Sequence, residues 1–105
     1  MEKESDIQQT ILDYLSYAKV FHYRQNSGGG YKSGDRFIPR FASVSGLPDI
    51  VCIIRGKYIG IEVKTAKGKQ SESQTDFQKE LESAGGTYIL ARSLDEVIEK
   101  LESVL

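Results

Sequence analysis

Hydrophobic positions recur at helical spacing in three parts of the chain. Residues 4–18 carry apolar residues on one helical face, which predicts an amphipathic helix. A second helix is predicted over residues 72–84, ending at Gly85-Gly86, since glycine readily adopts the backbone conformation that terminates helices. Ser93 and Glu96 form a capping box, which predicts the start of a final helix. The buried face of that helix is predicted to comprise Leu94, Val97, Ile98, Leu101 and Val104.

Shorter apolar or alternating runs between these helices predict strands. Such runs cover residues 20–26, 49–54, 57–64 and 87–91. Residues 36–43 predict a short edge strand, because Pro39 has no N–H to donate to a central sheet. Three consecutive glycines within residues 27–35 predict a flexible loop. The order of one helix, four strands, a helix, a strand and a helix predicts an α/β fold with a mixed β-sheet flanked by α-helices.

Length and composition predict one soluble globular domain. The chain has 105 residues, 39% of them hydrophobic and 28% charged. No apolar run approaches the ~20 residues that span a membrane, and the acidic, polar N-terminal segment does not have the pattern of a signal peptide. The only cysteine, Cys52, lies within an apolar strand and predicts a buried structural thiol. We therefore expect a cytoplasmic protein, in a bacterial or phage-infected host cell.

The net charge of −1 conceals a strong asymmetry along the chain. Residues 1–18 have a net charge of −3 and residues 70–105 a net charge of −5, whereas residues 19–69 carry ten Lys or Arg against three acids, a net of +7. This basic middle is a candidate surface for a polyanion. The alternative interpretation is a solvated surface of mixed charge.

Two carboxylates and a lysine interrupt the most apolar hairpin of the sequence. If Arg55-Gly56 is the turn, Asp49 lies opposite Glu62. If Gly56-Lys57 is the turn, Asp49 lies opposite Lys64. Both registers place Asp49, Glu62 and Lys64 on one face of the sheet, because side chains alternate with a period of two.

Opposed carboxylates repel one another and destabilise a sheet unless a cation lies between them. Mg²⁺ prefers one or two protein carboxylates together with waters and phosphate oxygens. Lys64 projects toward the same place as Glu62, where an ammonium can orient a water or stabilise developing negative charge. Asp49, Glu62 and Lys64 therefore predict a site for phosphodiester hydrolysis. The alternative is that alternating charges simply mark a half-solvated strand.

Three segments together resemble a known family. They are Gly46-Leu47-Pro48-Asp49-Ile50, then Ile61-Glu62-Val63-Lys64, then Ser71-Glu72-Ser73-Gln74. The combination resembles the virus-type replication-repair nuclease domain, VRR-Nuc, of the restriction-endonuclease-like PD-(D/E)xK superfamily. The resemblance covers nearly the whole chain and implies a stand-alone domain over residues 1–105 with a restriction-endonuclease-like fold.

The resemblance also implies roles for individual residues. Asp49 and Glu62 would bind Mg²⁺ or Mn²⁺, with the carbonyl of Val63 as a third ligand. Lys64 would be the catalytic lysine, and Gln74 matches the glutamine that follows the core motif in the family. Glu4, within Glu4-Ser5-Asp6-Ile7-Gln8, matches an acid on the family's N-terminal helix and would be a fourth catalytic group.

Structural roles for two of these residues remain open at this stage. Ser71 and Gln74 form a capping box, a role that needs no active site. Glu4 is also expected to interact favourably with the positive N-terminal end of its helix.

The resemblance implies a homodimeric, structure-specific DNA endonuclease that acts on branched DNA such as a Holliday junction. A flap or nicking nuclease is an alternative, and so is a non-catalytic DNA-binding module or nuclease subunit. Candidate DNA contacts in the basic middle are Arg24, Asn26, Tyr31, Lys32, Arg36, Arg40 and Lys67, although residues 27–35 are equally consistent with a connector. Candidate dimer contacts are Val20, Phe21, Phe37 and Phe41.

Overall fold

The structure is a computed structural model, which describes residues 2–25, 30–39 and 45–104. Its main element is a four-stranded sheet with the strand order β1-β4-β5-β6, in which β5 and β6 are parallel and the other pairs are antiparallel. The strands are β1 (Phe21–Arg24), β4 (Ile50–Ile54), β5 (Lys57–Val63) and β6 (Thr87–Ala91). The helices are α1 (Glu4–Tyr17), α2 (Glu72–Ser83) and α3 (Leu94–Val104). The predicted α/β fold with a mixed sheet is thus confirmed.

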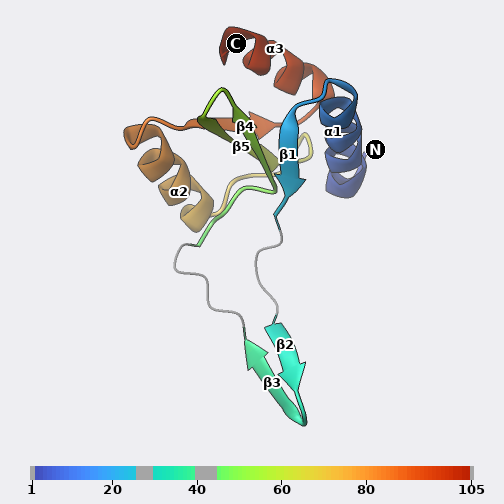
Figure 1. Cartoon of the computed structure of the whole chain (residues 1–105), viewed down its shortest axis with the longest axis vertical. Helices are drawn as coiled ribbons and strands as arrows, with labels where there is room; N and C mark the ends of the chain where they lie inside the picture. Colours follow the sequence, from blue (N-terminus) through green and yellow to red (C-terminus); the bar gives the residue numbers. More distant parts are fainter. Residues whose placement is uncertain (1, 26–29, 40–44, 105) are drawn as a thin grey trace.

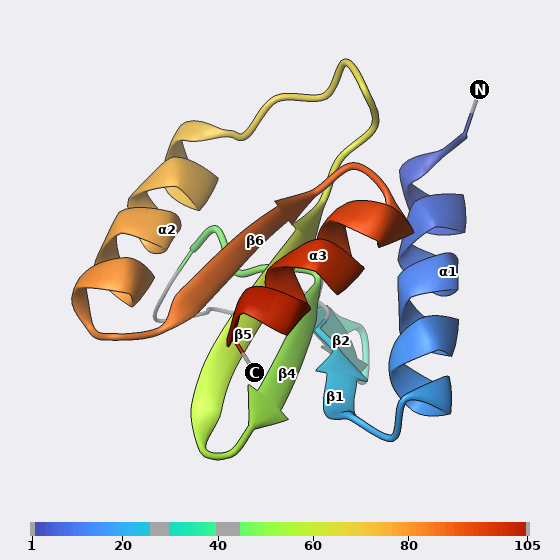
Figure 2. The same ribbon diagram turned by 90° about the horizontal axis from the view of Figure 1, so that it is seen from above.

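The helices cover the two faces of the sheet unequally (Figures 1 and 2). Helices α1 and α3 pack on one face and enclose the hydrophobic core with alternate residues of β4 and β5. Helix α2 lies on the other face against β6, where the rings of Phe77 and Tyr88 are 6.4 Å apart. The predicted inner face of α3 is correct for Val97 and Leu101, which are buried, and for Leu94 and Val104, which pack at the margin of the core. Ile98 was also predicted to be buried and is only half-buried.

The turn of the central hairpin settles the register that the sequence left open. Arg55 and Gly56 have φ values of 52° and 80°, as a two-residue type I′ turn requires. Ile54 accordingly pairs with Lys57 and Ile50 with Ile61. Continuing this register by one position places Asp49 opposite Glu62, on the face away from α1 and α3.

The prediction of a flexible loop over residues 27–35 is wrong in part. Gly30–Ser33 forms strand β2, which pairs with β3 (Arg36–Pro39) in a separate two-stranded sheet. Gly34 has a φ of +63° and permits the tight turn between them, so the two strands can pair with each other. Figure 1 shows this hairpin extending away from the face of the main sheet opposite α3. The strand predicted over residues 36–43 is confirmed for residues 36–39, and residues 40–43 lie outside the described residues.

Two other residues have structural roles. Burial raises the pKa of the Cys52 thiol to about 11, which confirms the prediction of a buried, unreactive thiol. His22 bonds the carbonyl of Val20 through Nδ1 at 2.7 Å and lies 3.4 Å from the hydroxyl of Ser16. These contacts join the end of α1 to β1.

Candidate active site

Asp49 lies immediately before β4, and contacts from two neighbouring strands determine its position. The backbone carbonyl of Asp49 accepts a hydrogen bond of 2.8 Å from the N–H of Gln25, which extends the pairing with β1. Its side-chain Oδ2 accepts a hydrogen bond of 2.8 Å from the N–H of Val63 at the end of β5. One carboxylate oxygen is therefore occupied by the backbone, and the side chain is held beside the Glu62-Val63-Lys64 segment.

The Gly46-Leu47-Pro48 segment is shaped by close packing. A Cβ on Gly46 would lie 2.1 Å from the carbonyl oxygen of Ser73, at the start of α2. Gly46 also has a φ of +76°, which favours glycine. Pro48 packs on Gly60 of β5, where an added Cβ would lie 2.8 Å from the proline ring. Two glycines thus allow the segment before Asp49 to lie against both α2 and the sheet.

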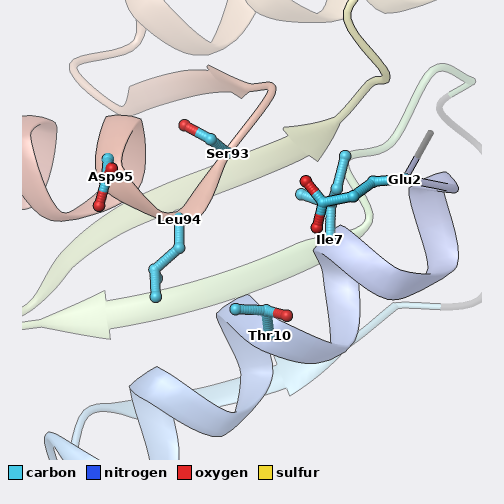
Figure 3. A pocket seen from close by; sticks show the side chains of 6 residues that line it. All are labelled: Glu2, Ile7, Thr10, Ser93, Leu94 and Asp95. Carbon is cyan, nitrogen blue, oxygen red and sulfur yellow. The ribbon is translucent and has the colours of Figure 1, made fainter.

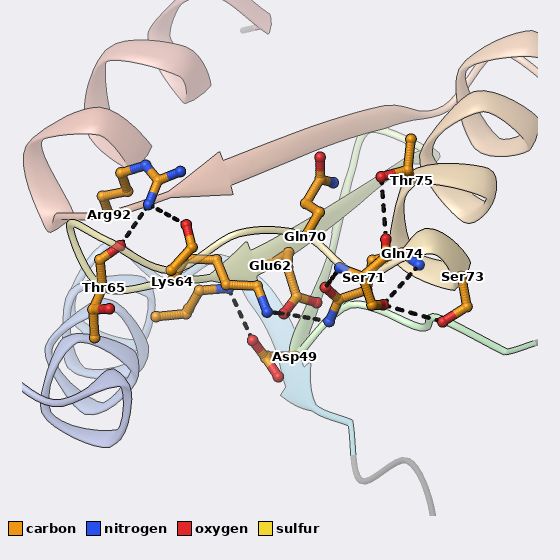
Figure 4. A network of polar contacts seen from close by, with 12 residues as sticks. Asp49, Glu62, Lys64, Thr65, Gln70, Ser71, Ser73, Gln74, Thr75 and Arg92 are labelled. Carbon is orange, nitrogen blue, oxygen red and sulfur yellow. Dashed lines mark hydrogen bonds and ion pairs between the residues drawn. The ribbon is translucent and has the colours of Figure 1, made fainter.

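Glu62 is the one charged residue buried among those that the structure describes, with 2% of its surface exposed. Its Oε2 accepts a hydrogen bond of 3.1 Å from Nε2 of Gln74 and lies 3.8 Å from Nζ of Lys64. Its Oε1 is buried and has no hydrogen-bond partner. A buried carboxylate oxygen without a partner is costly in a folded protein unless a ligand satisfies it. Figure 4 shows Asp49, Glu62, Lys64 and Gln74 converging at this position.

The electrostatics of Glu62 reflect the same arrangement. Burial, followed by the negative charge of Asp49, raises the pKa of Glu62 from 4.5 to about 8. Lys64 opposes this shift, and Glu4 makes the smallest contribution. Without a cation, the Glu62 carboxylate is therefore disfavoured at neutral pH.

Gln74 makes the contacts that both interpretations of the sequence expected. Its Oε1 accepts a hydrogen bond of 2.9 Å from the N–H of Ser71, and its backbone N–H donates to the Ser71 hydroxyl, which completes the capping box of α2. Its Nε2 remains free to donate to Glu62. The cap fixes the amide orientation, so the same side chain caps the start of α2 and donates to the buried carboxylate.

The donor set fits a hard divalent cation. Asp49 and Glu62 supply two carboxylates on one face, one with a buried oxygen that lacks a partner. Within residues 2–25, 30–39 and 45–104, no three Asp, Glu, His or Cys side chains gather as a complete metal cage. Two carboxylates with places left for water and phosphate oxygens are typical of Mg²⁺ rather than of structural Zn²⁺.

The remaining predicted residues lie at different distances from this centre. Glu4 is exposed at the start of α1, and its charge acts only weakly on Glu62. Arg24, Arg36 and Lys67 are exposed. Tyr31 and Lys32 belong to strand β2, and Phe37 belongs to strand β3. Asn26, Arg40 and Phe41 lie outside the described residues. Of the dimer candidates, Val20 packs against the core and Phe21 is exposed.

Arg92 contributes to the site and was not predicted. It follows β6, and its Nη1 donates to the carbonyl oxygens of Thr65, Ala66 and Gly68, the last at 2.8 Å. The backbone N–H of Lys64 bonds Ala91 at 3.0 Å. The segment that leaves β5 with Lys64 is therefore held by the end of β6 (Figure 4).

A pocket with a volume of about 180 Å³ lies between α1 and the start of α3 (Figure 3). Its lining includes Glu2 and Asp95 and no residue of the site described above. The helices that form it cover the opposite face of the sheet. Two acids without a basic residue in the lining make this pocket unsuited to a phosphate.

Comparison with solved structures finds the same fold in a protein described as "VRR_NUC domain". The TM-score is 0.68, the sequence identity is 19%, and the match covers 97% of each chain. The chain is therefore a VRR-Nuc-like domain in its fold, as the resemblance predicted. No family model and no curated protein matches the sequence. No helix among the described residues is long and apolar enough to cross a membrane.

Proposed function

We propose that the protein is a Mg²⁺- or Mn²⁺-dependent endonuclease that hydrolyses DNA phosphodiester bonds. The observation that carries this proposal is the Glu62 carboxylate, whose buried Oε1 has no hydrogen-bond partner and whose Oε2 lies 3.8 Å from Nζ of Lys64. A purely structural glutamate would be expected to have both oxygens paired. The VRR-Nuc-like fold supports the same chemistry, since that family is named for a nuclease.

Each residue has a distinct task in this proposal. Asp49 and Glu62 hold the divalent ion, with the Val63 carbonyl as a third ligand. When bound, the ion lowers the pKa of a coordinated water and stabilises charge on the scissile phosphate. The N–H groups of Lys64 orient the attacking water and stabilise the negative charge that develops on the phosphate. Gln74 and Arg92 act as positioning residues through Glu62 and the Lys64 segment, and Glu4 gives further negative charge from α1.

We also propose branched DNA as the substrate and a homodimer as the active form. Two sites related by a two-fold axis would suit paired cuts in a symmetric four-way junction. The support for this part is the resemblance to stand-alone VRR-Nuc domains and the basic character of residues 19–69.

The test is cleavage of labelled four-way junction, flap and linear duplex DNA in Mg²⁺, Mn²⁺ or EDTA. Wild type is compared with Lys64→Ala and with Lys100→Ala, which removes an exposed lysine of α3 on the opposite face of the sheet. We expect metal-dependent cutting of the junction that Lys64→Ala lowers at least about 100-fold and Lys100→Ala leaves intact.

Other outcomes select among the alternatives. Cutting of flap or duplex alone would retain the chemistry and replace the substrate. Equal activity of wild type and Lys64→Ala would refute the assigned site. Junction binding without any cutting, unaffected by EDTA, would indicate a non-catalytic DNA-binding module.

A further inference from the structure

The carboxylates share their sheet face with a row of exposed aromatic residues. In the observed register Tyr23 pairs with Val51 and Phe21 with Ile53, and Ile53 in turn pairs with Tyr58. Directly opposed residues lie on one face, and the period of two carries that face along β4 to Asp49. Phe21, Tyr23, Ile53 and Tyr58 are called the aromatic face below.

The aromatic face is the uncovered part of an otherwise buried sheet. Helix α2 covers this face only beside β6, and Pro48 covers Gly60 in the middle. Toward β1 the cover ends, so Phe21 is 66% exposed and Tyr23 46% exposed. The ring centroids of Phe21 and Tyr23 are 6.4 Å apart, with 69° between the ring planes. The pKa of Tyr58 is raised mainly by burial and secondly by the charge of Tyr23. The three aromatic side chains are therefore neighbours.

Apart from Asp49 and Glu62 themselves, the strands that form the aromatic face carry no acidic residue. Residues 19–25 and 50–61, which form β1, β4, most of β5 and their turns, contain no Asp or Glu. They contain four exposed bases, of which Lys19 and Arg55 lie in turns, whereas Arg24 and Lys57 pair with Ile50 and Ile54 and therefore lie on the opposite face. An aromatic surface with cations in the adjoining turns is suited to a single nucleic-acid strand, since bases stack on the rings and phosphates meet the cations.

The distance along β1 from the carboxylates to the aromatic face matches the spacing of nucleotides in a strand. Gln25 bonds Asp49, so Tyr23 lies two residues and Phe21 four residues farther along β1. At ~3.4 Å per residue these separations are roughly 7 and 14 Å. They correspond to about two and four stacked nucleotide steps of ~3.4 Å each.

We infer that Phe21 and Tyr23 form a stacking platform for unpaired bases of the DNA strand whose phosphate lies at Asp49 and Glu62. This inference rests on the proposed nuclease function and adds a substrate class to it, namely DNA with a single-stranded segment beside the cut. The platform recognises unpaired bases irrespective of sequence, because every base has an aromatic face. Cuts are expected about two to four nucleotides from the boundary between single and double strand.

The first experiment measures binding by fluorescence anisotropy in EDTA, so that no cleavage occurs. Wild type, Phe21→Ala/Tyr23→Ala and Phe21→Leu/Tyr23→Leu are titrated with a labelled single-stranded oligonucleotide and with the corresponding duplex. Tyr17→Ala is the control, because Tyr17 is an aromatic residue, 87% exposed, on α1 rather than on the aromatic face. Circular dichroism and thermal unfolding verify that every variant folds, as expected for exposed positions.

We expect each lost aromatic ring to weaken single-strand binding by about tenfold, since base–aromatic stacking is worth ~1–3 kcal/mol. The double leucine variant (the leucine pair) is expected to lose single-strand binding as the double alanine variant (the alanine pair) does. Binding of the duplex is expected to change far less in both. Two results would overturn the inference: no single-strand binding by wild type, or wild-type affinity in both double variants. If the leucine pair binds normally while the alanine pair loses both binding and a dimer seen by sedimentation, the aromatic face is an interface between copies.

A second experiment separates failure of the platform from failure of the nuclease. Wild type and the alanine pair are compared in Mg²⁺ on a duplex with a single-stranded tail and on a plain duplex. Loss of cutting on the tailed substrate alone supports the platform, whereas equal cutting by both proteins removes it and leaves the nuclease standing. Weakened single-strand binding in a protein that cuts nothing would instead keep the platform and refute the nuclease.

Discussion

The two hairpins of the molecule, β2–β3 and β4–β5, are built alike and differ in their surroundings. Each has a two-residue turn with a glycine in the left-handed conformation. Hairpin β4–β5 lies between β1 and β6, so its neighbours define the face on which every side chain lies. Hairpin β2–β3 packs against no other described helix or strand. Glu62 of β5 is therefore desolvated, whereas Asp35 and Arg36 of β2–β3 are exposed to water.

The largest expected difference between the hairpins concerns their acidic residues. Asp49→Asn removes a proposed metal ligand beside β4, so we expect cleavage to fall at least about 100-fold. Asp35→Asn, in the exposed turn of β2–β3, is expected to change cleavage less than about twofold. Initial rates on one substrate in saturating Mg²⁺ measure both. Similar losses in the two variants would show that the hairpins do not differ in this way.

A second difference concerns the response of stability to pH in EDTA. Because the pKa of Glu62 is raised to about 8 in the folded protein, the folded state binds its proton more tightly than the unfolded chain does. The associated stability is full below about pH 4.5 and is lost as the pH rises toward 8, by a few kcal/mol, on the order of 1.4 kcal/mol per pKa unit. Urea unfolding at several pH values measures this slope.

Two controls sharpen the pH prediction. Glu62→Gln removes the titrating group, so most of the dependence of the unfolding free energy on pH should disappear. Asp35→Asn should retain this pH dependence. Adding Mg²⁺ at pH 8 should restore stability to wild type and not to Glu62→Gln, because binding to the folded state alone stabilises it. A slope of the opposite sign would mean that Glu62 is not desolvated as described.

A third difference concerns glycines. Gly60→Ala places a Cβ 2.8 Å from Pro48, so we expect a loss of about 1–3 kcal/mol in the free energy of unfolding and lower activity through displacement of Asp49. Gly34→Ala meets no atom within 4 Å but has a φ of +63°, so we expect a loss of about 1 kcal/mol and normal activity. Urea unfolding measures the stability of both variants, and cleavage assays measure their activity. Reduced activity in Gly34→Ala would contradict this account.

The smallest expected effect belongs to Arg36, exposed at the start of β3. Arg36→Ala should leave the melting temperature unchanged and lower DNA affinity a few-fold. If Arg36 contacts a phosphate, the slope of log affinity against log salt should decrease by about 1. Lys100→Ala serves as the charge-matched control. An unchanged salt slope would remove Arg36 from the DNA contacts.

The sequence predicted β4–β5 well because local and global signals agree there. Arg55-Gly56 is a strong turn signal, and the resulting register brings Asp49 and Glu62 together with no information from the rest of the chain. The same locality misled the prediction for residues 27–35, where consecutive glycines obscured a strand that is defined mainly by pairing with β3. Propensity is a weaker guide where pairing, rather than packing, forms the element.

Other features depend on contacts between distant segments and could not be predicted. From the sequence, Gln74 is either a helix cap or a site residue. Only the position of Glu62 shows that the amide oxygen accepts from Ser71 while the amide nitrogen donates to Glu62. No local sequence pattern around Arg92 predicts its hydrogen bonds to carbonyls more than twenty residues earlier. Phe21 and Tyr23 alternate with His22 and Arg24, so the sequence does not reveal which face of β1 the helices leave uncovered.

The contacts made by β6 and Arg92 have a consequence for biosynthesis. The segment that carries Lys64 is paired with Ala91 and bonded by Arg92, although neither residue takes part in the proposed chemistry. A ribosome releases these residues well after both carboxylates have emerged. The nascent chain therefore carries Asp49, Glu62 and Lys64 without the strand that orders them, and the site is completed only when residues 87–92 have also been made.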